Sequence, residues 1–202
     1  MRRLIAFAAL LCAFAAQAQA PTLVDDILGH LARHTQVRAD FTQSRENPAL
    51  AEPQVSHGEL LFVIGHGMLW HTRDPFEDTL VLTAGDTSRI DAQGKLERVR
   101  DGNRGVSQVS AMLQSLLAGK SDEAMRQFSV TAEGTPERWT LRFVPRQARM
   151  ARVLAGITLK GDAFLESIEV NLATGERTLI TFANTRDAGT LTLLEAKVLG
   201  VP

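Results

Sequence analysis

The sequence predicts an α+β domain in which one antiparallel β-sheet carries most of the chain. Residues 56–72 form a two-stranded hairpin pattern with apolar side chains on both faces of the first strand. Further short apolar runs are separated by turn residues, and hairpins in such close succession form an antiparallel meander. Two apolar helical stripes between residues 107 and 128 interrupt this pattern. The 202 residues suffice for one sizeable domain.

The N-terminal residues are expected to be a cleaved secretory signal. Arg2 and Arg3 precede an apolar run over residues 4–16, which is shorter than the ~20 residues that span a bilayer. We place the cut after Ala18, so that residues 1–18 are the signal and residues 19–202 form one exported domain. Cys12 is the only cysteine and lies in the signal, so we expect no disulfide or thiol chemistry in the mature chain.

Charge and motifs exclude several function classes. The 22 Lys and Arg residues nearly balance the 23 Asp and Glu residues, so no long-range field favours nucleic acid, and we expect no such partner. Residues 65–67 lack the third glycine of a dinucleotide loop, and no Walker sequence is present. His30 and His34 are one helical turn apart, but a catalytic zinc needs three protein ligands. We therefore expect no catalytic residue, no metal and no cofactor.

The first part of the domain should form a helix, a strand and a loop. Residues 22–25 have the capping-box pattern, and apolar residues at helical spacing extend this helix to about Thr35. Residues 37–45 alternate between apolar and polar up to Phe41, which predicts a strand with one face on the core. Asn47 and Pro48 begin a loop.

The central hairpin is the stretch on which the functional prediction rests. Residues 60–64 are apolar at every position, so both faces of this strand need cover. Residues 65–67 then turn the chain, and Met68 and Trp70 point to one side of the second strand. One face of the hairpin can be the ordinary core. We expect the other face to line an apolar cavity that holds an apolar guest.

The remaining chain is predicted to form further hairpins around a helical insertion. A helix begins at Ser107 and ends near Gly119, and Ser121 begins a shorter helix that carries Met125 and Phe128. The predicted strands cover residues 79–82, 88–92, 95–100, 139–143, 156–160, 164–172, 176–184 and 190–198.

Two groups of residues have more than one interpretation. The apolar stripe that includes Met112 and Leu116 can plug the core, or it can be a movable lid with Met112 as an adaptable contact. Arg146, Arg149 and Arg152 can be a solvated loop, or they can form a docking patch for an acidic partner, because exposed charge tunes encounter.

Several short motifs, taken in order, resemble those of the LolA-like family of periplasmic outer-membrane lipoprotein carriers. They cover nearly the whole chain after the signal. The motifs are Ala39-Asp40-Phe41-Thr42-Gln43, Gly58-Glu59-Leu60, Met68-Leu69-Trp70, Pro75, Leu80-Val81, Gly85-Asp86, the helical insertion, the strand that ends at Pro145, and Gly175 before residues 178–182.

This resemblance implies a half-open, incomplete antiparallel β-barrel with a helical lid on its concave face, in a monomeric periplasmic protein that is not an enzyme. Such carriers hold acyl chains of lipoproteins or lipids. They take them from an inner-membrane transporter and pass them to an outer-membrane acceptor lipoprotein. With the residue pattern, the resemblance implies lipid contacts by Leu60, Phe62, Met68, Trp70, Leu80, Met112, Leu113, Leu116 and Leu117.

The sequence departs from the family at one position that concerns the lid. Typical carriers place an arginine six residues before the tryptophan, where it bonds the lid, whereas this chain has Ile64 there. We therefore expect lid control to differ. A specialised cargo, such as a polyene or fatty acyl product, also fits. So do a non-catalytic sensor of mislocalised lipoprotein and a hydrolase whose triad is not visible in the sequence.

Overall fold

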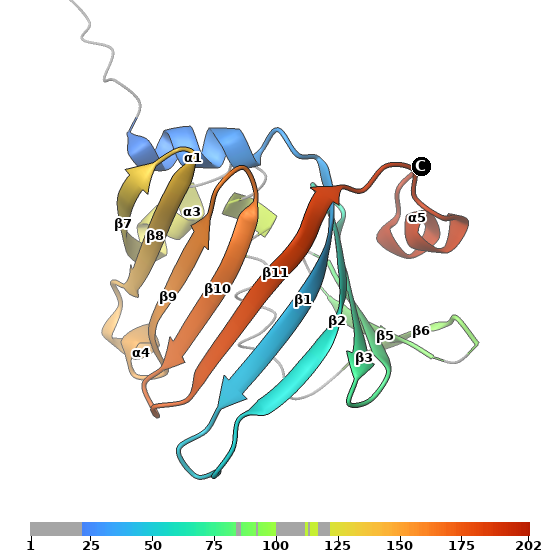
Figure 1. The fold of residues 1–202 in the computed structure, drawn as a ribbon, viewed down its shortest axis with the longest axis horizontal. Coiled ribbons are helices and arrows are strands. Elements are labelled where there is room, and N and C mark those ends of the chain that lie inside the picture. The colour runs from blue at the N-terminus through green and yellow to red at the C-terminus, as the bar shows by residue number, and fades with distance from the viewer. Residues whose placement is uncertain (1–21, 84–85, 92, 100–111, 113, 117–121) are drawn as a thin grey trace, which may run out of the picture.

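A single antiparallel sheet of eleven strands dominates this computed structural model (Figure 1). The structure describes residues 22–83, 86–91, 93–99, 112, 114–116 and 122–202, so the expected signal and the predicted start of the second helix lie outside it. The spatial order is β6-β5-β4-β3-β2-β1-β11-β10-β9-β8-β7. The strands are β1 (Gln36–Glu46), β2 (Gln54–Val63), β3 (Gly67–Asp74), β4 (Asp78–Leu82), β5 (Thr87–Ile90), β6 (Leu96–Arg98), β7 (Phe128–Thr135), β8 (Arg138–Pro145), β9 (Leu154–Gly161), β10 (Leu165–Leu172) and β11 (Arg177–Asp187).

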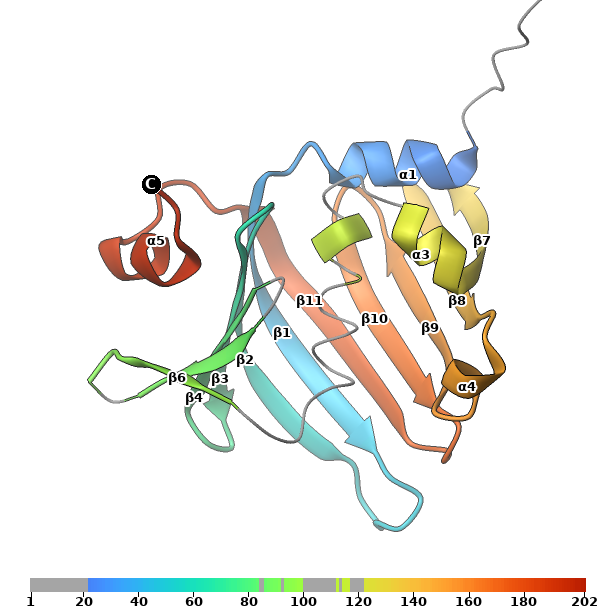
Figure 2. The same ribbon diagram turned by 180° about the vertical axis from the view of Figure 1, so that it is seen from behind.

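Strands that follow one another in the chain pair with each other, except for β6 and β7. One further pair, which we call the seam, joins two strands that are far apart in the chain. There β1 pairs with β11, with Phe41 opposite Phe182 and Gln43 opposite Ile180. This seam joins an early run of strands, β1–β6, to a late run, β7–β11, and the two runs curve around a common concave side (Figure 2). The edge strands β6 and β7 do not pair with each other. The predicted half-open antiparallel barrel of the α+β class is confirmed.

The helices cover the two faces of the sheet unequally. Helix α1 (Leu23–Leu31) is capped by Thr22, whose side chain accepts from Asp25 N while the Asp25 carboxylate accepts from Thr22 N, as the capping-box pattern predicted. Helix α3 (Asp122–Gln127) lies with α1 over the concave side of β7–β10. Helix α5 (Leu193–Leu199) instead packs on the back of β2–β4. No described helix is both long and apolar enough to cross a membrane.

Four local features differ from the prediction. Residues 190–198 were expected to be a strand, but they contain α5, because Thr192 and Glu195 form a second capping box. The strand β7 was not predicted, and Phe128, which was expected on the short helix, is its first residue, because apolar and polar residues alternate from there onward. The arginine-rich loop contains a short helix, α4 (Ala148–Ala151), and α1 ends at Leu31, four residues before the expected end.

The late run of strands has a filled core. Trp139, Leu141 and Phe143 of β8 are each at most 2% exposed, and they pack under α1, α3 and Leu116. On the back of the early run, a smaller cluster packs α5 against the sheet through Val198 and Leu199. Fully burying one such side chain contributes about 1.5–3 kcal/mol, so these two clusters hold the helices in place.

Two buried glycines let an aromatic ring lie flat against the sheet. A Cβ at Gly58 would be 2.8 Å from the ring of Phe41 on the neighbouring strand. A Cβ at Gly161 would be 2.6 Å from the ring of Trp139. The same Cβ atoms would be even closer to a backbone carbonyl oxygen, that of His71 and that of Phe164 respectively. The absence of a side chain is therefore a packing requirement in both runs of strands.

Candidate apolar binding site

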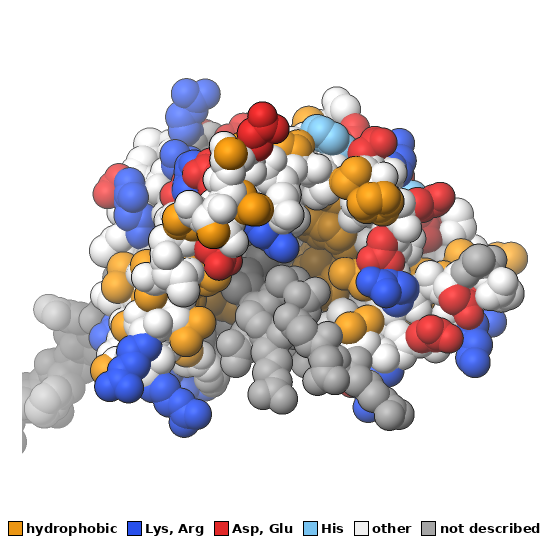
Figure 3. Space-filling view, turned by 90° about the horizontal axis from the view of Figure 1, so that it is seen from below, with side chains coloured by type: hydrophobic (Ala, Val, Ile, Leu, Met, Phe, Trp, Pro, Cys, Tyr) orange, Lys and Arg blue, Asp and Glu red, His pale blue; other side chains and the backbone are white. Residues whose placement is uncertain are grey.

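The concave face of β1–β4 gathers an apolar cluster that we call the hollow. Cross-strand pairing places its residues in two rows, one through Met68 and one through Trp70. Phe62, Met68 and Leu82 are buried, whereas the other members are half-buried. Figure 3 shows, from below, a recess with hydrophobic side chains on its inner wall. The members of the hollow are Val37, Leu60, Phe62, Ile64, Met68, Trp70, Leu80 and Leu82.

Trp70 is held in place by a ring contact that the sequence prediction did not include in the site. Its ring centroid lies 4.0 Å from that of Phe41, with 30° between the ring planes. Phe41 is only 3% exposed, so it fixes one face of Trp70 while the rest of the indole stays half-buried. The alternation of residues 37–41 was the signal for Phe41, but it indicated only the ordinary core.

The opposite face of the same strands is closed by α5. Leu61, Leu69 and Val81 pack there against Val198 and Leu199, each at most 8% exposed. Residues 60–64 were expected to need cover on both faces, and the two faces differ in what covers them. The back face is filled by α5, and the front face forms the hollow.

An ion pair fixes α5 to the back of the hollow. Arg38 Nη1 donates to Glu195 Oε1 at 2.8 Å, and both side chains are less than a quarter exposed. Burial raises the pKa of Glu195, but the hydrogen bonds from Arg38 and Thr192 lower it by more, so this pKa is below its ordinary value. The carboxylate is therefore charged at neutral pH, where it both caps the helix and holds it to β1.

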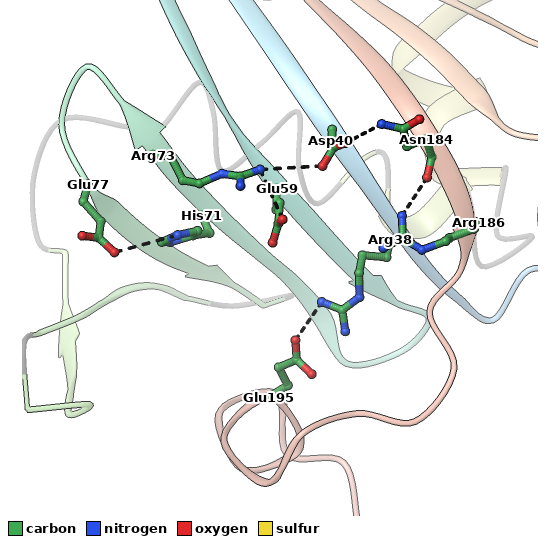
Figure 4. Close-up of polar contacts among 9 residues, drawn as sticks. All are labelled: Arg38, Asp40, Glu59, His71, Arg73, Glu77, Asn184, Arg186 and Glu195. Atoms are coloured by element: carbon green, nitrogen blue, oxygen red, sulfur yellow. Dashed lines mark hydrogen bonds and ion pairs between the residues drawn. The ribbon is translucent and has the colours of Figure 1, made fainter.

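Polar side chains of these strands gather on the same back face (Figure 4). Arg73 reaches Glu59 at 3.2 Å and Asp40 at 3.7 Å, and Asn184 donates to Asp40 at 2.7 Å. Asn184 has a left-handed φ of 54° beside the irregularity in the β1–β11 pairing. The charges therefore neutralise one another on the back and leave the wall of the hollow apolar.

One ion pair borders the hollow at its β4–β5 side. Arg89 lies opposite Leu80 in the β4–β5 ladder, and its guanidinium contacts both carboxylate oxygens of Asp78, at 2.7 and 3.0 Å. In such a bidentate pair the guanidinium and the carboxylate satisfy much of each other's hydrogen-bonding capacity. It marks where the apolar wall gives way to a polar border.

The predicted lipid-contact residues fall into two separate clusters. Leu60, Phe62, Met68, Trp70 and Leu80 all lie in the hollow. The described helical residues 112 and 114–116 lie on the same concave side, but their apolar side chains join the filled core, where Leu116 is 1% exposed and Met112 is half-buried. Leu113 and Leu117 lie outside the described residues.

A hydrogen bond nevertheless links this helical segment to the hollow. Gln114 Nε2 donates to the Leu82 carbonyl oxygen at 3.2 Å, so the segment spans from the filled core to strand β4. Ile64, which replaces the arginine of typical carriers, is half-buried in the hollow and offers no polar group to such a segment. In this chain the polar group that links the helical segment to the hollow is the side-chain amide of Gln114.

The predicted docking arginines lie in α4 and on either side of it. Arg149 and Arg152 are exposed, and Arg146 is exposed but donates from Nε to the Phe128 carbonyl oxygen at 2.8 Å. They lie at the opposite end of the sheet from α1 and α5 (Figure 1). Their position is therefore separate from the walls of the hollow.

The two histidines that were expected one turn apart on the first helix do not converge on one point, and only His30 lies in α1. His34 Nδ1 lies 2.9 Å from Asp187 and its ring is 4.1 Å from that of Phe164, whereas His30 is on the half-buried side of α1. Among the described residues, no three His, Cys, Asp or Glu side chains form a group that could hold a metal ion. What the concave face offers is an apolar binding surface.

Comparison with known proteins places this geometry in a family. Residues 15–199 match the family model described as outer membrane lipoprotein carrier protein LolA-like. No curated protein sequence matches the chain. Among solved structures, the MucA/MucB complex of Pseudomonas aeruginosa is 12% identical with a TM-score of 0.51, covering 87% of this chain and 60% of that one.

Two further structures are similar. MucB alone is 13% identical with a TM-score of 0.51, covering 84% of this chain and 60% of that one. A LolA superfamily protein of Nitrosomonas europaea is 9% identical with a TM-score of 0.49, covering 85% of this chain and 96% of that one. At these identities a structural likeness concerns the fold alone. The family match, by contrast, extends over nearly the whole chain, and the protein therefore belongs to the LolA-like family of outer membrane lipoprotein carrier proteins.

Proposed function

We propose that the protein is a periplasmic carrier that binds acyl chains of lipoproteins or lipids in the hollow and shuttles them between membranes. The observation that carries this proposal is the contrast within one strand pair. The back of β2 and β3 is filled by α5, whereas Leu60, Trp70 and Leu80 on the front remain half-buried. Apolar surface that the chain itself leaves uncovered suits an apolar guest.

Burial of an acyl chain supplies the driving force. Each buried CH₂ contributes ~0.8 kcal/mol, so a long chain gains on the order of 10 kcal/mol before the costs of ordering. The wall offers mainly dispersion contacts from residues such as Met68 and Leu80, which are weakly directional and can adapt to different chains. A carrier needs this adaptability, because it must also release its cargo.

The proposed partners follow from this role. An inner-membrane transporter loads the protein and an outer-membrane acceptor lipoprotein unloads it, while the protein itself makes and breaks no bond. In this proposal the segment around Gln114 is the part of the concave side that cargo must pass. The hydrogen bond from Gln114 to Leu82 is one contact that entry of cargo would break, and a neutral hydrogen bond of this kind contributes ~1 kcal/mol.

The two tryptophans allow a test of where cargo binds. Trp70 lies in the hollow, whereas Trp139 is buried in the filled core. A fatty acid brominated on its acyl chain quenches a tryptophan that it touches, so we expect quenching in the native protein and its loss in Trp70→Phe. Quenching of equal depth in Trp70→Phe would show that the chain binds elsewhere and would contradict the assignment.

Charge placed in the wall gives a second test. Leu80→Glu and Met68→Glu should weaken binding of a fluorescent fatty acid at least about tenfold, because a carboxylate in the wall must be desolvated. Leu96→Glu is the matched control, since Leu96 is 42% exposed on β6 and outside the hollow. Circular dichroism establishes that each variant is folded. Unchanged affinity in both folded variants would remove the hollow from the proposal.

A further inference from the structure

One end of the sheet brings several chain connections together below the hollow. The β1–β2, β3–β4, β8–β9 and β10–β11 connections all lie there, away from α1 and α5 (Figures 1 and 2). Three of them touch in series: Ala173 N donates to the Val153 carbonyl oxygen at 2.9 Å, and a Cβ at Gly175 would be 3.3 Å from Pro48. Figure 3 views this end, and the recess is visible from it. We call this end the lower rim.

The lower rim exposes large apolar side chains. Val153, after α4, is 65% exposed, and Val144, at the end of β8, is 54% exposed. Leu50 in the β1–β2 connection and Phe76 in the β3–β4 turn are 48% and 81% exposed. Single exposed apolar residues are ordinary, but here they occur on three of the four connections at one end.

Charge on the rim is strongly segregated. Residues 138–161 contain no acid at all, and they carry basic residues at both ends of β8 and β9. The group on the lower rim is Arg146, Arg149 and Arg152, around α4, whereas Arg138 and Lys160 lie at the opposite end of these strands. Neither Arg149 nor Arg152 forms an ion pair with any described residue, so both guanidinium groups are available to a partner.

Acids on the rim lie on other connections. Glu52 is in the β1–β2 connection, Glu176 follows the β10–β11 turn, and Asp74 and Glu77 flank Phe76. An anionic surface is therefore attracted by the α4 corner and repelled by the β3–β4 turn. This asymmetry fixes which corner makes the first contact.

We propose that the α4 corner, formed by Arg149, Arg152, Val144 and Val153, docks on an anionic lipid bilayer and sets the open end of the hollow against the lipid. Exposed valines beside arginines that pair with no described acid match the two parts of a bilayer interface. The valines enter the apolar boundary, and the arginines extend their stems along it to reach phosphate groups.

This inference rests on the proposed function, because docking supplies a route by which cargo enters or leaves the hollow without crossing water. It replaces the acidic protein partner expected for these arginines. An acidic protein would account for the charge, but not for two valines exposed beside it at 54% and 65%. A lipid surface accounts for both.

Vesicle co-sedimentation tests the inference with the full mature chain. We expect binding to vesicles of phosphatidylglycerol and phosphatidylcholine, weakened by added salt, and little binding to phosphatidylcholine alone. Arg149→Glu/Arg152→Glu should weaken binding at least about tenfold, since each basic residue near an anionic surface contributes a substantial attraction. Val153→Ser should weaken it roughly threefold through lost apolar burial.

The matched control is Arg138→Glu/Lys160→Glu, which makes the same change of net charge on the same two-strand region but at its other end. This double variant should bind vesicles nearly as the native protein does. If both double variants lose vesicle binding equally, net charge and not the position of the arginines determines binding, and the proposal is overturned. No vesicle binding by the native protein would also overturn it and would favour an acidic protein as the partner of the arginines.

A second readout separates this inference from the proposed function. Arg149→Glu/Arg152→Glu should bind a fluorescent fatty acid in solution with unchanged affinity, because neither arginine is part of the hollow. If the native protein binds vesicles at the α4 corner but no fatty acid, the carrier proposal fails and docking stands. If it binds fatty acid but no vesicles, docking fails and the carrier proposal stands.

Discussion

The two runs of strands use the same alternation on the concave face but differ in what covers it. In the late run, Leu141 and Phe143 are 0% and 1% exposed, because α1, α3 and Leu116 pack over them. In the early run, Leu60, Trp70 and Leu80 point to the same side and remain half-buried. Alternation therefore determines which face is apolar, whereas the covering elements determine whether that face becomes a core or a binding surface.

The largest expected effect contrasts one leucine from each run. Leu141→Ala removes a fully buried side chain from the filled core and should lower the free energy of unfolding by ~3 kcal/mol, since the transfer loss and the cavity add. Leu80→Ala truncates a half-buried wall residue and should cost less than ~1 kcal/mol. Urea unfolding followed by circular dichroism measures both. Equal costs would mean that the early run is filled as tightly as the late one.

The attachment of α5 to the back of the hollow should have an intermediate effect. Glu195→Gln removes the charge that accepts from Arg38 and should lower the free energy of unfolding at pH 7 by ~1–2 kcal/mol. Because the pKa of Glu195 is lowered in the folded protein, its contribution is present above the ordinary value of 4.5 and is lost as the pH falls through the lowered pKa.

Urea unfolding at pH 7 and in mild acid checks the sign. The difference between the native protein and Glu195→Gln should shrink as the pH falls below 4.5. A difference that stays constant would mean that the carboxylate stabilises α5 without its charge. Glu195→Gln should also bind fatty acid more weakly than the native protein at pH 7, because α5 supports the strands that form the wall of the hollow.

The smallest expected effect compares the two helix caps. Thr22→Ala removes the cap of α1 over the filled core, and Thr192→Ala removes the cap of α5 behind the hollow. Each should cost ~1 kcal/mol by leaving backbone N–H groups without a partner. Only Thr192→Ala should also weaken fatty-acid binding. A change of affinity in Thr22→Ala alone would place the binding surface in the late run instead.

Much of the sheet could be predicted from local pattern. The capping box at residues 22–25, the two-faced strand and the turn at Gly65 and Gly67 each reflect a short-range rule. The structure contains all three, with the strand ending at Val63, one residue before the expected end. The helix at residues 193–199 was missed because its apolar residues suggested a strand, although Thr192 and Glu195 carried the capping signal. At these residues the apolar pattern favours a strand and the capping box favours a helix, and the chain forms the helix.

The candidate site was harder to predict, because it depends on contacts between distant residues. The wall residues Met68, Trp70 and Leu80 followed from alternation and resemblance. That Leu116 joins the filled core depends on packing against β8 and α1, which no local pattern contains. The contact of Phe41 with Trp70 likewise depends on the closeness that Gly58 permits between strands.

The seam between β1 and β11 determines when during synthesis the sheet can be completed. Residues 36–46 leave the ribosome long before their partner strand, residues 177–187, has been made. The early strands can form hairpins with one another, yet β1 keeps an unpaired edge until β11 arrives, and such long-range pairing is slow. The two runs of strands can therefore share one concave side only after β11 has been made.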